Sequence, residues 1–167
     1  MRRVTAVLSV AAVVLWATAA FAQGKPNFAG KWTREAPAGG AAAAGGGGGG
    51  GGRGGGGGGF GMECTITQDA NTLTVEYMAG QNPLKLAYKL DGSESKNSMP
   101  GRGGGAATEV TSTAKWEGSK LVITTKGANG DTVRALSMDG AKLSVETTAP
   151  GRQGGEATTT KATYTKG

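Results

Sequence analysis

Three arginines in glycine-rich stretches are the residues of this sequence whose chemistry is most evident. Arg53 lies between glycines, and the tripeptide Pro-Gly-Arg occurs twice, ending at Arg102 and at Arg152. A guanidinium group is a planar fork of donors that matches a carboxylate or a phosphate. These arginines indicate a cationic rim for the anionic head of an amphiphile. The alternative is that they are only solvated surface charges.

Catalytic chemistry is scarce in the sequence. It has no histidine, and its single cysteine, Cys64, cannot form an internal disulfide. Without histidine there is no Ser-His triad and no His/Cys zinc cluster, and no nucleophile elbow is present. The glycine clusters do not lead into a helix, as a phosphate-binding loop must. We therefore expect a protein that is not an enzyme, with no catalytic residue, no metal site and no cofactor.

The first 22 residues have the composition of an export signal. Arg2 and Arg3 precede an apolar run from Val4 to Ala19, and Ala20-Phe21-Ala22 matches a signal-peptidase site. The sequence predicts a cleaved signal peptide, an exported periplasmic or extracellular protein, and no membrane span in the mature chain. The alternative is an uncleaved anchor, since the run is just long enough to cross a bilayer.

The Arg-Gly-Gly pattern around Arg53 also resembles segments that bind RNA through flexible cationic contacts. The main glycine tract carries only this arginine, and the net charge of the whole chain is +6. This charge is mild for a nucleic-acid-binding protein, and export separates the chain from RNA. We therefore expect no nucleic-acid partner.

Short runs of alternating apolar and polar residues fill the chain after the main glycine tract. In Leu84–Leu90 the leucines and Tyr88 fall on one face, and the lysines fall on the other. A period of two residues is that of a β-strand. The sequence predicts an all-β, antiparallel up-and-down meander of eight to ten strands, with candidates at 27–33, 63–68, 72–78, 84–90, 93–98, 108–116, 120–126, 131–138, 141–148 and 156–165.

The turns between these strands are of two kinds. Acidic-Gly pairs such as Asp91-Gly92 and Asp139-Gly140 indicate tight hairpins, because glycine accepts a positive φ. In a meander the turns alternate between the two ends of the sheet. One end, the tight end, receives 69–71, 91–92, 117–119 and 139–140. The opposite end, the loose end, receives 36–61, 79–83, 99–106, 127–130 and 150–155, and we expect it to be the mouth of a ligand-binding barrel.

Phe28, Gly30 and Trp32 form the pattern Phe-x-Gly-x-Trp ahead of the meander. This pattern and its position resemble the opening of the lipocalin and fatty-acid-binding protein superfamily. The chain also resembles secreted bacterial lipocalin-like proteins with repeated Asp-Gly-x-Lys-Leu hairpins. The resemblance implies a closed barrel in which Trp32 packs across the closed end. Fatty-acid-binding proteins carry a helical lid after the first strand, and this chain has a glycine tract there instead.

The chain therefore divides into a signal peptide at 1–22, a first barrel strand within 23–35, a glycine-rich loop at 36–61 and the remaining barrel at 62–167. The loop has almost no apolar side chain to bury, and glycine loses the most entropy on ordering. We expect the loop to be disordered.

Alternation places three large aromatic side chains, Tyr77, Tyr88 and Trp116, on the inward face of the barrel. Together with Arg102 and Arg152 they are the expected ligand-binding residues. The expected function is that of an exported barrel that binds a small hydrophobic or amphiphilic molecule. The alternative is an envelope-associated interaction module with a filled barrel and no ligand. An interior cavity of about 300 Å³ or more would favour the ligand.

Overall fold

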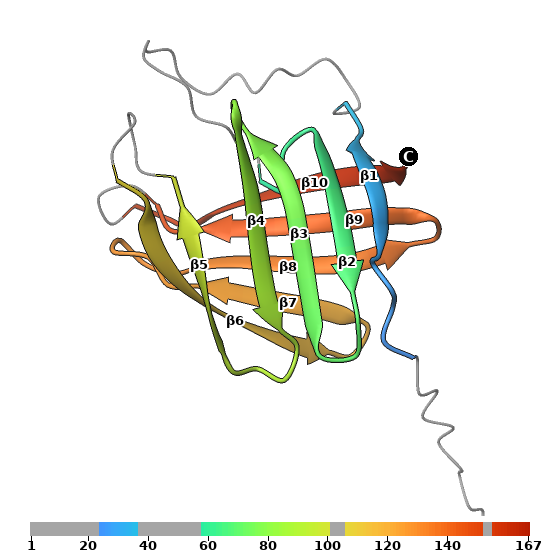
Figure 1. Ribbon diagram of the computed structural model, residues 1–167, viewed down its shortest axis with the longest axis horizontal. Coiled ribbons are helices and arrows are strands. Elements are labelled where there is room, and N and C mark those ends of the chain that lie inside the picture. Colours follow the sequence, from blue (N-terminus) through green and yellow to red (C-terminus); the bar gives the residue numbers. More distant parts are fainter. Residues whose placement is uncertain (1–23, 37–57, 101–105, 152–154) are drawn as a thin grey trace, which may run out of the picture.

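The structure is a ten-stranded antiparallel β-barrel that is nearly closed (Figure 1). It is a computed structural model that describes residues 24–36, 58–100, 106–151 and 155–167. The predicted signal peptide and most of the glycine-rich loop lie outside these ranges. Every regular element in the described ranges is a strand, which confirms the predicted all-β meander. The strands are β1 (Gly30–Arg34), β2 (Glu63–Gln68), β3 (Thr72–Ala79), β4 (Asn82–Lys89), β5 (Glu94–Met99), β6 (Thr108–Glu117), β7 (Lys120–Thr125), β8 (Thr132–Asp139), β9 (Lys142–Ala149) and β10 (Thr158–Lys166).

Neighbouring strands follow one another along the chain, except that β1 pairs with β10 as well as with β2 and so joins the first strand to the last. The order is β4-β3-β2-β1-β10-β9-β8-β7-β6-β5. Trp32 on β1 lies opposite Cys64 of β2 on one side and Lys166 of β10 on the other. In Figure 1, strands β2–β4 cross in front of β7–β10 at a steep angle. The barrel is thus flattened into two halves that pack face to face.

The barrel is completed between β4 and β5 by side chains. Asn97 on β5 accepts a hydrogen bond from the Ala87 N–H at 2.8 Å and donates one to the Ala87 carbonyl at 3.0 Å. Ser95 Oγ accepts from the Lys89 N–H at 2.8 Å. Both side chains are buried, and they satisfy backbone groups of β4 that the backbone of a paired strand would otherwise bond. The strand predicted at 93–98 is polar because its side chains, rather than its backbone, bond to β4.

The tight end of the barrel is built as the turn residues predict. Gly92, Gly118 and Gly140 have φ angles of 84°, 62° and 60°, in the region that favours glycine. The predicted wide turn at 79–83 is wrong, because β3 ends at Ala79 and β4 begins at Asn82. Gly80, with φ of 71°, makes a two-residue turn there. The loose end therefore includes one tight hairpin as well.

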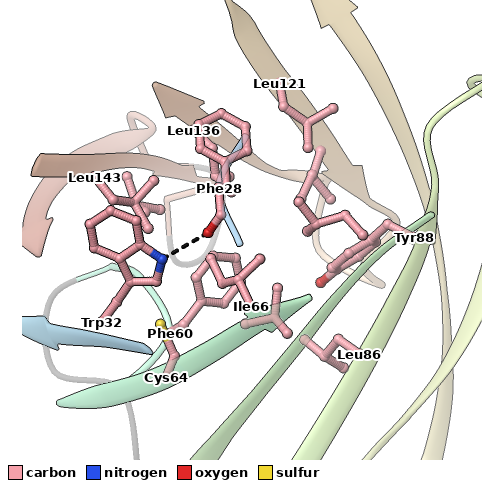
Figure 2. Packing of buried hydrophobic residues seen from close by; sticks show 14 of the residues in the cluster. Phe28, Trp32, Phe60, Cys64, Ile66, Leu86, Tyr88, Leu121, Leu136 and Leu143 are labelled. Atoms are coloured by element: carbon pink, nitrogen blue, oxygen red, sulfur yellow. Dashed lines mark hydrogen bonds between the residues drawn. The ribbon is translucent and has the colours of Figure 1, made fainter. Parts of the chain in front are cut away.

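The core fills the space between the two halves (Figure 2). On β4 the alternation is complete, since Leu84, Leu86 and Tyr88 are buried and their neighbours are exposed. Trp32 is fully buried, and its indole N–H donates a hydrogen bond of 2.8 Å to the Phe28 carbonyl. Tyr77 and Trp116, two of the aromatic residues expected to face inward, are half-buried.

No helix in the described ranges is long and apolar enough to cross a bilayer.

Candidate functional site

An arginine points into the barrel. Arg134 on β8 lies opposite Ile123 of β7 and Thr147 of β9, and both of these residues are buried. It also alternates with Leu136, which is fully buried. The Nε atom of Arg134 is buried and has no hydrogen-bond partner among the described residues. A buried donor without a partner is uncommon in folded proteins, and an acceptor supplied by a ligand is one way to satisfy it.

The interior beside Arg134 is occupied by residues 58–61, which we call the strap. Phe60, at its centre, is fully buried. The Phe60 N–H donates a hydrogen bond of 2.7 Å to the Tyr164 hydroxyl, which in turn donates one of 3.1 Å to the Gly61 carbonyl. The Gly59 N–H donates to Thr147 Oγ1 at 3.2 Å. The strap is therefore held against the inward face of β9 and β10 by two side chains.

Glycine is required on the strap because the backbone runs close to the sheet in an unusual conformation. Gly58 and Gly59 have φ angles of 56° and 103°. A Cβ atom at Gly58 would overlap the Thr160 hydroxyl, and one at Gly59 would overlap the Tyr164 hydroxyl. The end of the glycine-rich stretch thus has a specific role, which is to bring Phe60 into the barrel.

Aromatic rings and the arginine share this space. The guanidinium carbon of Arg134 lies 5.8 Å from the centroid of the Phe60 ring, within range of a cation–π contact. The rings of Phe60 and Tyr77 have centroids 5.9 Å apart at an interplanar angle of 57°. Burial raises the pKa of Tyr77 and raises that of Tyr88 to about 12, while the positive charge of Arg134 opposes both shifts. Both phenols therefore lie within electrostatic reach of Arg134.

The expected site residues are only partly brought together. The ring of Tyr77 packs against Phe60, which also contacts Arg134, and the charge of Arg134 lowers the pKa of both Tyr77 and Tyr88 against the effect of burial. Trp116 lies at the tight end of β6, where its ring stacks on Phe28 with centroids 5.8 Å apart. Arg102 and Arg152 lie outside the described residues, as does Arg53.

Sequence reasoning missed Arg134 and Phe60. Arg134 occupies an alternating run with Thr132, Leu136 and Met138, so its inward position was available from the period of two. Phe60 is the one large aromatic residue in 36–61, and this isolation was the available signal.

Two hollows in the described part of the chain lie on outer faces of the barrel. The larger, of about 700 Å³, crosses β1–β4 between rows of outward side chains that include Lys31, Met78 and Lys85. Residues of the inward row, which are Trp32, Cys64, Tyr77 and Leu84, also contribute to its lining. The smaller, of about 280 Å³, lies over β6 and β7. Arg134 and Phe60 line neither hollow. Next to Arg134 the interior is occupied by the fully buried Phe60.

Ionisation of the buried Cys64 and Tyr88 is expected to destabilise the fold at alkaline pH. Burial raises the pKa of the Cys64 thiol from 9.0 to about 12 and that of Tyr88 from 10.0 to about 12. The unfolded chain therefore releases these protons first, so the free energy of unfolding is undiminished below about pH 9 and falls as the pH rises through about 12. Urea titrations from neutral to alkaline pH measure this loss.

The Cys64→Ala variant is the control for this titration. It removes the part of the loss that begins near the thiol's ordinary pKa of 9.0, and it keeps the part due to Tyr88. A urea midpoint that stays constant up to about pH 11 would contradict the assignment of both groups to the core.

In the described ranges no three Cys, Asp or Glu side chains gather as a metal site requires. No protein-family model matches the chain, and no curated protein is similar to it. The nearly closed antiparallel barrel is compatible with a lipocalin-like fold.

Proposed function

We propose that this protein is an exported, non-enzymatic β-barrel that binds a small anionic amphiphile in its interior, with Arg134 on the anionic head. The barrel and its inward arginine support the binding role. The signal-like residues 1–22 support export, and the Phe-x-Gly-x-Trp pattern at Phe28–Trp32 supports kinship with lipocalin-like proteins. The absence of histidine from the sequence supports a role without catalysis.

The observation that carries the proposal is the buried, unpartnered Nε of Arg134. Leaving a buried donor unsatisfied costs about 1–3 kcal/mol, and more for a charged group. The neighbours of Arg134 in the strand register, Ile123 and Thr147, offer no carboxylate. The four ion pairs found among the described residues join lysines to glutamates on the outer surface, and none involves Arg134. A carboxylate brought by a ligand would satisfy the guanidinium that the barrel leaves without one.

Arg134→Gln is expected to remove the preference for an anionic head group. We expect the wild-type protein to bind dodecanoate at least about 10-fold more tightly than dodecanol, since a charge-assisted hydrogen bond contributes about 1.5–3 kcal/mol. The difference should vanish in Arg134→Gln and persist in part in Arg134→Lys. Isothermal titration calorimetry with both probes measures it.

Lys85→Gln is the matched control, because it removes one positive charge from an exposed ion pair with Glu76 on the outer face. It should bind dodecanoate as the wild type does. Equal dodecanoate affinities for Arg134→Gln and Lys85→Gln would show that Arg134 does not hold the head group.

A second candidate function is a filled-barrel interaction module without a ligand. One observation favours it: Phe60 is fully buried beside Arg134, so a side chain of the protein itself occupies the interior at that point. A wild-type protein that binds neither probe would favour this second function.

A further inference from the structure

Resting on the proposed function, we propose that the strap is a built-in competitor of the ligand: Phe60 occupies the place of the ligand's apolar body, and an amphiphile binds by displacing it. The ring already has the two properties that such a body needs. It is fully buried in the core, and it lies against the guanidinium of Arg134. Unlike an anionic amphiphile, the Phe60 ring carries no charged head group, so Arg134 Nε is left without a partner.

The strap is attached in a way that allows it to leave without disrupting the barrel. Residues 58–61 belong to no strand, so they add nothing to the ladders that hold the sheet together. Two of the three side-chain hydrogen bonds that hold the strap pass through the hydroxyl of Tyr164. Release of the strap therefore breaks its hydrogen bonds to Tyr164 and Thr147 and requires no strand pairing to break.

The glycines of the strap favour a balance between the docked and the released states. Gly58, Gly59 and Gly61 each have a positive φ when docked, and glycine gains more backbone freedom on release than any other residue. The burial of Phe60 opposes this gain. When the competent state is only part of the population, the apparent affinity for a ligand falls by that fraction. The strength of the strap thus sets the affinity of the site.

Tyr164→Phe tests the proposal without emptying the core. The variant keeps the ring and deletes the hydroxyl that binds both the Phe60 N–H and the Gly61 carbonyl. We expect its affinity for dodecanoate to rise by about 5-fold or more, because a larger share of the protein has a released strap. Thr159→Val is the matched control, since it deletes a hydroxyl that bonds Thr148 on the outer side of the same two strands. It should leave the affinity unchanged.

Hydrogen exchange gives a second measurement on the wild-type protein. Saturating dodecanoate should speed exchange at the amides of Gly59 and Phe60 and should leave the amides of β9 and β10 protected. Phe60→Ala adds a third: phenylacetate, a ring with a carboxylate, should bind this variant at least about 10-fold more tightly than the wild type, since the ring's place is vacant.

The outcomes separate this proposal from the proposed function. If dodecanoate binds through Arg134 but Tyr164→Phe and Thr159→Val bind it equally and the strap amides stay protected, the strap is not a competitor and the proposed function stands. If neither the wild type nor any strap variant binds dodecanoate or phenylacetate, both proposals are overturned.

Discussion

Trp32→Ala is expected to lower the free energy of unfolding by about 3–5 kcal/mol, in the range of large-to-small substitutions of buried aromatic residues. Trp32 is the largest of the fully buried side chains. The substitution leaves a cavity in the core and frees the Phe28 carbonyl, which accepts the indole N–H at 2.8 Å (Figure 2). It also weakens β1 at the position where that strand faces both β2 and β10. Urea denaturation followed by circular dichroism measures the loss.

Trp116→Ala is the comparison for this variant, since it deletes the same side chain from a half-buried position at the tight end. Its ring stacks on Phe28 and lies 5.7 Å from the Lys25 ammonium, but it is not enclosed by the core. We expect a smaller loss than for Trp32→Ala. Equal losses would mean that the two tryptophans contribute alike and that Trp32 has no special place in the closure of the barrel.

Gly59→Ala is expected to expel the strap and so to have two large effects of opposite sign. A Cβ atom at this position overlaps the Tyr164 hydroxyl, and the φ of 103° is unfavourable for any other residue. The fold should lose the burial of Phe60, with an upper bound of about 3–5 kcal/mol. The affinity for dodecanoate should rise, since the competitor is removed. Urea denaturation and calorimetry on one protein preparation measure both effects.

Gly80→Ala separates backbone strain from the loss of docking. Gly80 has a φ of 71°, and a Cβ atom there would meet nothing within 4 Å. Its substitution should cost only the about 1–2 kcal/mol of the left-handed conformation and leave ligand affinity unchanged. If Gly59→Ala behaved like Gly80→Ala in both measurements, the close contact between the strap and Tyr164 would have no energetic weight.

The fold could be predicted because its determinants are local. The alternation within Leu84–Leu90 and the glycines of the tight turns act over two to four residues, and they specify strands and hairpins without further information. Closure was predicted from a resemblance, and the register of β1 against β10 has no local signal. The two-residue turn at Gly80 was missed because Pro83 was read as part of a loop, and it lies instead on an edge strand, where its missing N–H is tolerated.

The candidate site was predicted poorly because its determinants are remote. Phe60 and Tyr164 are 104 residues apart, so nothing near Phe60 shows that its N–H has a partner. Periodicity cannot place a residue that lies outside the strands. The period of two already allows an inward Arg134, but an arginine on a strand is ordinarily exposed. Its pairing with the buried Ile123 and Thr147 shows that it does face inward.

The position of β1 between β2 and β10 has a consequence for how the protein folds. In the described part of the chain, the other ladders join strands that follow one another directly, so β2–β4 and β5–β10 can each assemble from local contacts. Both ladders of β1 close long loops. The chain loses conformational entropy when these loops close, and this loss precedes the stabilisation that the new contacts bring. We therefore expect the docking of β1, a strand of five residues, between the already formed β2–β4 and β5–β10 to set the folding rate.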